Sequence, residues 1–363
     1  MKGKMMKNLD KKEWAEFSLN EIFTVDAGKR LENRNKIPGK HPFIGATDNG
    51  NGVTGFVGNE NSSKDKNVLG VNYNGAPCIA FYHPYECVFT DDVKRLHLIN
   101  HADTSDILLY FISIFAQQRT KYTYGYKFKE QRMYRQKLML PVTDSGEPDY
   151  EYMSEYIQDN RKAMLAKYRA YVKNRIAELG EYVEIPALSE KEWKAYRLSF
   201  LGSVESGRDI YAQERVCGRI PYITAGSQNN GIGYFVDNCN DTYDSGYIAF
   251  NRNGAVGCAF YHHYLSVMGN DCRKLHLKAA DKNLYVGISI AMLISMQSKS
   301  FSYSRKLGTA RANKLQIMLP VTDLGEPDYG YMEQYAKNMM IRKYRQYLSF
   351  LDAKDKTETV QGK

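Results

Sequence analysis

One stretch of the chain is written twice. Residues 138–150 read LMLPVTDSGEPDY, and residues 317–329, which begin 179 positions later, read IMLPVTDLGEPDY. The same offset relates other landmarks: Trp14 and Trp193, Pro42 and Pro221, and His97 and His276. A constant offset leaves no room for a net insertion or deletion between the copies. The chain is therefore a tandem duplication, and each copy, at roughly 130 residues, is long enough to form a domain with its own core.

Each copy has the pattern of a mixed fold. Short apolar runs alternate with Gly, Asn, Asp and Pro, which is typical of brief strands joined by turns. Residues 103–118 have the length and apolar spacing of a buried helix. The repeated motif predicts a closing strand, a turn and then a helix that starts near Pro148. The sequence thus predicts a mixed, β-rich α/β fold in two tandem copies.

A long helix is predicted after each copy. Apolar side chains recur at steps of three and four residues from Met153 to Leu179, and the seam returns from Met332 to Leu351. Because one seam cannot bury itself, we expect the helices to pair as an antiparallel coiled coil that relates the copies by a pseudo-two-fold axis. The predicted boundaries are 1–13 for a disordered leader, 14–142 and 193–321 for the globular domains, 143–179 and 322–353 for the helices, 180–192 for the linker and 354–363 for a polar tail.

Composition narrows the class of protein. The apolar fraction of 43% and the charged fraction of 25% are those of a soluble globular protein, and a net charge of +9 favours a polyanionic partner. The apolar runs at 107–116 and 286–296 are about half the length of a membrane span, so we expect a cytoplasmic protein without a membrane partner. Six cysteines form no CxxC pair and differ in position between the copies, so we expect them to be reduced and to bind no metal.

No repeated catalytic constellation is present. Residues 50–55 match the GxGxxG fingerprint of dinucleotide sites, but no helix pattern follows and the second copy breaks the match. Glu147 and Asp149 are similar to a nuclease carboxylate pair, yet they stand at a helix start, where capping explains them better. His83 and His97 recur in the second copy without a recurring acidic or thiol neighbour, so we expect structural histidines. We assign no catalytic residue and no metal ligand.

Polar residues that recur at turns are the candidates for contact with DNA bases. Asn and Gln amides present a donor beside an acceptor, which is the pattern that reads adenine in the major groove. An Asn-Gly pair also simply forms hairpin turns, and for each residue that alternative stays open. The candidates are Thr47, Asn49, Asn51, Asn72, Tyr73 and Asn74 in the first copy, and Ser227, Gln228, Asn230, Asn251, Arg252 and Asn253 in the second.

A basic and aromatic segment follows the predicted buried helix in each copy. Residues 119–137 hold seven Lys or Arg and one acidic residue, and residues 298–316 hold five and none. An anion relieves the repulsion among so many cations, so we interpret the segment as a phosphate contact, with a solvated face as the alternative. The candidates are Lys29, Arg30, Arg34, Tyr124, Lys127 and Arg132 in the first copy, and Arg208, Tyr303, Arg305, Lys306 and Arg311 in the second.

The order domain, helix, domain, helix, with the linking motif LMLPVTDSGEPDY/IMLPVTDLGEPDY, resembles the specificity subunit of type I or type IIB restriction-modification systems. The resemblance covers about 14–352. It implies that each globular domain is a non-catalytic target recognition domain that holds one half of a split double-stranded DNA sequence. It also implies that the helices set the spacing and dock methyltransferase subunits, with a fused or separate endonuclease subunit. S-adenosylmethionine and Mg²⁺ would then belong to the partner subunits, and this chain would hold no cofactor.

The predicted helices are shorter than those of the longer type I members, which suits a compact type IIB subunit or a short type I variant. Helices of about 25–30 residues span about 40 Å, so the half-site centres would lie roughly 10–14 base pairs apart, about one turn of duplex. Two other functions stay open from the sequence: a tandem enzyme such as a nuclease, and a tandem carbohydrate- or protein-binding adaptor.

Overall fold

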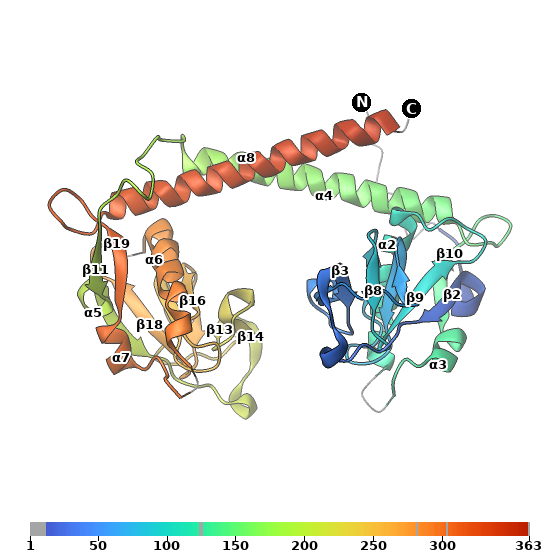
Figure 1. Cartoon of the computed structure of the whole chain (residues 1–363), viewed down its shortest axis with the longest axis horizontal. Helices are drawn as coiled ribbons and strands as arrows, with labels where there is room; N and C mark the ends of the chain where they lie inside the picture. The colour runs from blue at the N-terminus through green and yellow to red at the C-terminus, as the bar shows by residue number, and fades with distance from the viewer. Residues whose placement is uncertain (1–11, 123–125, 281, 303, 362–363) are drawn as a thin grey trace. The chain divides into compact units, whose positions relative to one another are not determined.

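The chain divides into two units, Met1–Tyr168 and Arg169–Lys363, whose boundary falls within the long helix α4 (Tyr150–Leu179) (Figure 1). The computed structural model describes residues 12–122, 126–280, 282–302 and 304–361, with the backbone alone over 355–361. The predictions made for residues 1–11, Tyr124, Tyr303 and 362–363 lie outside the described residues.

Unit 1 is a mixed α/β fold, as the sequence predicts. One antiparallel sheet has the order β2-β9-β6-β7, formed by Phe23–Ala27, Val93–Leu98, Val68–Asn72 and Ala80–His83. A mixed sheet has the order β4-β3-β8-β5, formed by Val53–Val57, Pro38–Ile44, Cys87–Phe89 and Lys64–Asp65. A two-stranded sheet pairs β1 (Trp14–Ser18) with β10 (Lys137–Pro141) in antiparallel register. The closing motif therefore returns to the start of the domain.

Unit 2 repeats this arrangement. Its antiparallel sheet has the order β12-β18-β15-β16, formed by Gly202–Ser206, Cys272–Leu277, Tyr247–Asn251 and Ala259–His262. Its mixed sheet has the order β14-β13-β17, formed by Ile232–Val236, Cys217–Ile223 and Val267–Met268. The two-stranded sheet pairs β11 (Trp193–Arg197) with β19 (Gln316–Pro320). The short helices are α1 (Leu19–Ile22) and α3 (Glu130–Arg135) in unit 1, and α5 (Leu198–Leu201) and α7 (Thr309–Lys314) in unit 2.

One apolar helix completes the core of each unit. The predicted helix over 103–118 is confirmed as α2 (Ser105–Gln117), whose Leu108, Phe111 and Phe115 are fully buried against the antiparallel sheet. Its counterpart α6 (Leu284–Met296) covers the equivalent sheet of unit 2 (Figure 1). No helix among the described residues is both long and apolar enough to span a membrane.

The long helices differ in extent from their predicted ranges. Helix α4 begins at Tyr150, close to the predicted start near Pro148, because a turn occupies the first residues of the predicted segment 143–179. It ends just before Gly180, whose φ of +81° suits a helix end. Helix α8 (Tyr329–Gln361) continues past residue 353. The polar tail extends the helix because it holds neither Gly nor Pro before Gly362.

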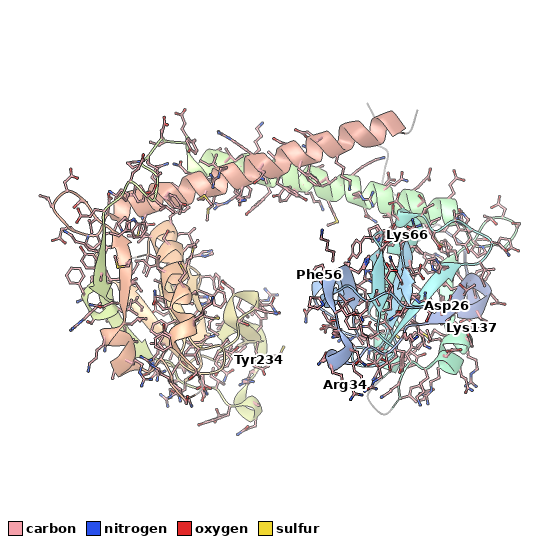
Figure 2. The ribbon with its side chains drawn as sticks, in the orientation of Figure 1. Asp26, Arg34, Phe56, Lys66, Lys137 and Tyr234 are labelled. Carbon is pink, nitrogen blue, oxygen red and sulfur yellow. The ribbon has the colours of Figure 1, made fainter. Side chains whose placement is uncertain are left out.

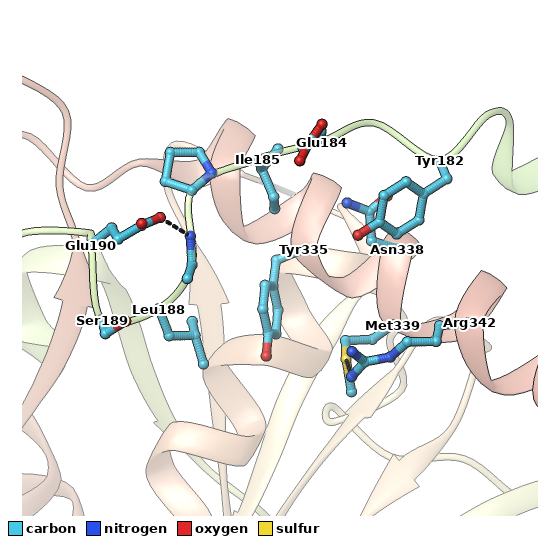
Figure 3. Close-up of a pocket in the computed structure, with 12 residues that line it drawn as sticks. Tyr182, Glu184, Ile185, Leu188, Ser189, Glu190, Tyr335, Asn338, Met339 and Arg342 are labelled. Atoms are coloured by element: carbon cyan, nitrogen blue, oxygen red, sulfur yellow. Dashed lines mark hydrogen bonds between the residues drawn. The ribbon is translucent and has the colours of Figure 1, made fainter.

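The linker of residues 180–192 lies along α8 inside unit 2. Asn338 Nδ2 donates to the Val183 carbonyl at 2.6 Å, and the Tyr331 hydroxyl donates to the Pro186 carbonyl at 2.9 Å. A cavity of about 640 Å³ lies between linker and helix, and Figure 3 shows the residues that line it. Two carboxylates, those of Glu184 and Glu190, line this cavity against one cation, Arg342. The balance of charge does not suit a polyanion, and the cavity forms no part of the interface described below.

Aspartates cap both long helices, which confirms the capping interpretation of the repeated motif. The Asp149 carboxylate accepts the Tyr152 N–H at 2.8 Å and the Asp328 carboxylate accepts the Tyr331 N–H at 2.9 Å. Lys12 and Lys191 pair with the same two carboxylates at 2.7 and 2.8 Å, respectively.

Removing one cap should destabilise its helix. We expect Asp328→Ala to lower the free energy of unfolding by about 1 kcal/mol, because it leaves an N-terminal N–H of α8 without its acceptor. Asp328→Asn is the control: it keeps an acceptor oxygen at the cap but removes the charge that faces Lys191, so its loss should be smaller. Chemical denaturation of the two variants measures the difference, and equal losses would show that the ion pair rather than the cap matters.

Candidate nucleic-acid interface

The recurring polar and basic residues lie in three segments of each unit. In unit 1 we name them the amide loop (residues 45–52), the Asn-Gly turn (72–77) and the basic segment (119–137). The equivalent segments of unit 2 are 224–231, 251–256 and 298–316. The basic segments contain α3 and α7, which Figure 1 shows at the end of each unit away from its long helix.

Contacts within unit 1 bring the three segments together, although the residues in contact lie as many as 71 positions apart in the chain. The contacts join the segments in pairs, so their mutual positions are fixed. They are Asn72 Nδ2 to the Thr47 carbonyl at 2.9 Å, Phe128 N–H to the Tyr73 carbonyl at 3.2 Å, and Arg119 Nη2 to Asp48 Oδ2 at 3.4 Å.

Unit 2 has matching contacts. Asn251 Nδ2 donates to the Gly226 carbonyl at 2.8 Å, and Leu307 N–H donates to the Arg252 carbonyl at 3.2 Å. The turn also requires glycine at one position: Gly254 has a φ of +61°, and a Cβ there would lie 2.8 Å from the Ala225 carbonyl oxygen. The close approach of turn and loop is therefore built into the sequence.

The structure corrects the interpretation of Asn72 and Asn251 as residues that touch bases. Their side chains are 1% and 2% exposed, respectively, and both amides are used to hold the amide loop. Each stands at the end of the central strand β6 or β15, which places it in the interior. Contact with a base would require the loop to open, so we assign both a positioning role.

The tips of the amide loops are exposed and carry the remaining amides. Asn49, Ser227 and Gln228 are exposed, whereas Thr47 is half-buried. Asn51 and its equivalent Asn230 are also exposed and have left-handed φ angles of 54° and 57°, which Asn tolerates better than most residues.

A repeated chain of hydrogen bonds ties each loop tip to the interior. Asn51 Nδ2 donates to the Tyr85 hydroxyl at 3.0 Å, and that hydroxyl lies 3.4 Å from Nδ1 of His83. In unit 2 Asn230 donates at 3.0 Å to the hydroxyl of Tyr264, which lies 3.1 Å from Nδ1 of His262. Sequence reasoning missed both tyrosines, although the offset of 179 residues between them was the available signal.

The histidines at the inner end of these chains are kept neutral by burial. Burial lowers the pKa of His83 to about 4, and burial together with the nearby His263 lowers the pKa of His262 to about 4. A neutral imidazole accepts a hydrogen bond at Nδ1 when its proton is on Nε2, so the tyrosine hydroxyl can donate to it. Both histidines are therefore structural, as the sequence predicts.

A second pair of histidines has acidic partners that the sequence did not predict. His97 Nε2 lies 3.1 Å from Asp65 Oδ2, and the equivalent His276 Nε2 lies 2.9 Å from Asp244 Oδ2. The partner escaped notice because it lies 32 residues away, on another strand. Among the described residues no group of three His, Cys, Asp or Glu side chains could hold a metal ion.

An aspartate orients each Asn-Gly turn. Asn74 Nδ2 donates to Asp92 Oδ1 at 3.0 Å, and in unit 2 Arg252 Nη2 bonds Asp271 Oδ1 at 2.9 Å. Hydrogen bonds from Arg252 and, less strongly, from Asn253 lower the pKa of the Asp271 carboxyl. These aspartates offset part of the positive charge at the turn, and they too share the offset of 179.

The cations of the basic segments serve partly as internal supports. Arg132 Nη1 donates to the Lys127 carbonyl at 2.7 Å while its guanidinium stacks 3.8 Å from the centre of the Tyr126 ring. Arg311 donates to the Lys306 carbonyl in the same way. The remaining surfaces of these guanidinium groups line two cavities, of about 360 Å³ in unit 1 and about 390 Å³ in unit 2.

The other predicted cations lie at the surface. The backbone N–H of Lys29 donates to Phe89, and that of Arg208 donates to Met268, so the two occupy matching positions. Arg30 and Arg305 are exposed. Arg34 is 80% exposed in its side chain, pairs with Glu32, and lies at the end of unit 1 away from α4 (Figure 2).

Comparison with known proteins identifies the family of this chain. The model of the type I restriction modification DNA specificity domain matches residues 11–167 and again 190–346, two ranges related by the same offset of 179. The specificity subunit S.BcgI of a type II restriction enzyme from Heyndrickxia coagulans is 47% identical over 152 residues. That match covers 42% of this chain and 45% of the relative, so it spans less than half of either.

Solved structures give more distant matches. The type I restriction-modification S subunit from M. genitalium is 15% identical, with a TM-score of 0.49 over 95% of this chain and 93% of its own. The HsdS subunit from Thermoanaerobacter tengcongensis is 12% identical, with a TM-score of 0.31 over 94% and 91%. On the two family-model matches, which together cover most of its length, the chain belongs to the family of the type I restriction modification DNA specificity domain and carries that domain twice.

Proposed function

We propose that the chain is the specificity subunit of a restriction-modification complex and that each unit binds one half of a split duplex sequence. The observation that carries this proposal is the repeated interface. In each unit an amide loop, an Asn-Gly turn and a basic segment meet, and each unit contains one matched specificity domain. Amides beside cations are the combination that duplex DNA requires, since bases specify and phosphates position.

The proposal divides the work among the candidate residues. The exposed loop residues Asn49, Ser227 and Gln228 contact base edges, and the cations of the basic segments contact phosphates. Asn72 and Asn251 hold the loops in place. Because the loop tips read Asp48-Asn49 in one unit and Ser227-Gln228 in the other, the two half-sites differ in sequence.

The long helices pair as an antiparallel coiled coil and set the distance between half-sites. Support comes from unit 2, where Arg169 of α4 pairs with Asp352 of α8 at 2.6 Å and Tyr171 packs edge-on against Tyr344. The residue numbers fall on α8 as they rise on α4, which is the antiparallel order. At about 1.5 Å per residue the helices correspond to half-sites roughly 10–14 base pairs apart.

Catalysis in this scheme lies in partner subunits. Methyltransferase subunits would bind the paired helices and carry S-adenosylmethionine, and an endonuclease, fused or separate, would supply the Mg²⁺ chemistry. The pairing of the helices would relate the two units by a pseudo-two-fold axis and so place two methyltransferases in equivalent positions.

Selection from a random duplex library tests this function. The full chain, with its methyltransferase partner, is expected to enrich two short motifs separated by a fixed number of unspecified base pairs, about one helical turn between centres. Failure to enrich any duplex would contradict the specificity role. Half-sites that are adjacent or two turns apart would contradict the helix-length argument alone.

A further inference from the structure

The cavity in the basic segment of unit 2 is lined by four cations. Arg252 comes from the Asn-Gly turn, Arg273 from strand β18, and Lys306 and Arg311 from the basic segment around α7. The cavity measures about 390 Å³, and no carboxylate is among the described residues that line it, although Asp271 pairs with Arg252 at 2.9 Å. Asp271 offsets only part of the charge of these four cations, and the remaining excess of positive charge favours an anion.

Arg273 is the deepest of these cations. It is 6% exposed, and its Nη1 donates to the carbonyls of Asn270 and Cys272 at 2.9 and 2.7 Å. Its Nε makes no hydrogen bond with any described residue, and the same is true of Nε of Arg252. Burial, followed by repulsion from Arg252, lowers the pKa of the Arg273 guanidinium. A ligand oxygen in this cavity would supply an acceptor for these two buried donors.

In unit 1 an acidic side chain neutralises the cation at the equivalent position. Lys94 stands at the position of Arg273 and pairs with Glu130 of α3 at 3.0 Å. Hydrogen bonding from Lys94 is the largest cause of the lowered pKa of the Glu130 carboxyl. The residue at the position of Glu130 in unit 2 is Thr309, which lines the cavity and carries no charge.

We propose that the cavity lined by Arg252, Arg273, Lys306 and Arg311 is a phosphate-binding site, which a backbone phosphate of duplex DNA fills, and that Glu130 closes the equivalent site in unit 1. Guanidinium groups suit this ligand because their forked N–H donors match two phosphate oxygens. The inference rests on the proposed function and adds an asymmetry at one position: unit 2 contacts a phosphate where unit 1 has the ion pair of Lys94 with Glu130.

The test places the acid of unit 1 in unit 2. Thr309→Glu fills the cavity with a carboxylate, and Thr309→Gln is the matched control, equal in size but without charge. Equilibrium binding of the full chain to a random-sequence duplex is measured over a range of salt concentrations. We expect Thr309→Glu to bind about tenfold more weakly than Thr309→Gln and to lower the slope of log affinity against log salt by about 0.9, which corresponds to one lost phosphate contact. The reciprocal variant Glu130→Gln should raise the slope by a similar amount.

The outcomes separate this inference from the proposed function. If the unchanged chain binds no duplex even with its methyltransferase partner, the proposed function fails. If it binds, but Thr309→Glu and Thr309→Gln have equal affinity and slope, the DNA-phosphate site is overturned and the function stands. Inorganic phosphate distinguishes the source of the ligand: if it raises the Tm of the unchanged chain but not of Thr309→Glu, while duplex binding of the variants is equal, the cavity takes a free anion and the backbone assignment is wrong.

Discussion

Replacing Asn251 with alanine should remove discrimination at one half-site and leave the other intact. The Asn251 side chain holds the amide loop of unit 2 in place, because its Nδ2 donates a hydrogen bond to the Gly226 carbonyl at 2.8 Å. Without it the carbonyl of the half-buried Gly226 loses its donor, at a cost of about 1–3 kcal/mol, and the loop carrying Ser227 and Gln228 loses its fixed position. We expect the preference for the correct base pairs at that half-site to fall about tenfold or more.

The matched control is the equivalent change in unit 1. Asn72→Ala releases the other amide loop, through the Thr47 carbonyl, and should relax only the other half-site. Duplex selection with each variant, compared with the unchanged chain, measures the two half-sites separately. Equal relaxation of both half-sites by either variant would show that the units are not independent readers, and unchanged selectivity would show that the loops do not read bases.

Acidification should destabilise the protein between about pH 6.5 and pH 4, by about 3 kcal/mol for each of His83 and His262. Burial lowers the pKa of each to about 4 in the folded state. A base whose folded pKa lies below its unfolded value binds fewer protons when folded, so its contribution to stability is present above the unfolded pKa of 6.5 and is lost as the pH falls toward 4. Protonation also removes the acceptor at Nδ1 and so breaks the link from Tyr85 or Tyr264.

The control for the acid effect is a double variant, His83→Asn with His262→Asn. Asparagine offers an acceptor oxygen near the position of Nδ1 but does not titrate, so the free energy of unfolding of the variant should depend less on pH in this window. Denaturation at a series of pH values measures the free energy of unfolding of both proteins.

The pKa of His97 is shifted in the opposite direction. Burial alone would lower its pKa, but Asp103 and Asp65 raise it, so its stabilisation persists at low pH and is lost as the pH rises through the raised value. If the free energy of unfolding of the unchanged chain and of the double variant depended on pH in the same way, the role given to His83 and His262 would be contradicted.

Local patterns were enough to predict most of the architecture. The offset of 179 predicted the duplication, the apolar spacing of residues 103–118 predicted helix α2, and the acidic residue beside Pro148 predicted the cap of α4. The duplication is visible as identical residues at one offset, and the helix and its cap depend on neighbours within one or two turns of chain, which a sequence displays directly.

The burial of individual side chains and the contacts between residues far apart in the chain could not be predicted in the same way. Asn72 carries the amide expected of a base reader, but its place at the end of a central strand buries it, and the sequence does not show how far a strand end lies from solvent. The residues around Arg273 show only the alternation of side chains that is usual for a strand. Arg273 becomes part of a cation cluster because Arg311 folds beside it. Such juxtapositions arise from tertiary contacts over many residues.

Methylome mapping tests the central claim most directly. DNA is sequenced for modified bases from a strain that carries this chain with its methyltransferase partner, and from the same strain without the chain. The two-domain account predicts a split motif, with two different short half-sites at one constant spacing, that is modified only when the chain is present. An identical methylome in the two strains would contradict the specificity role.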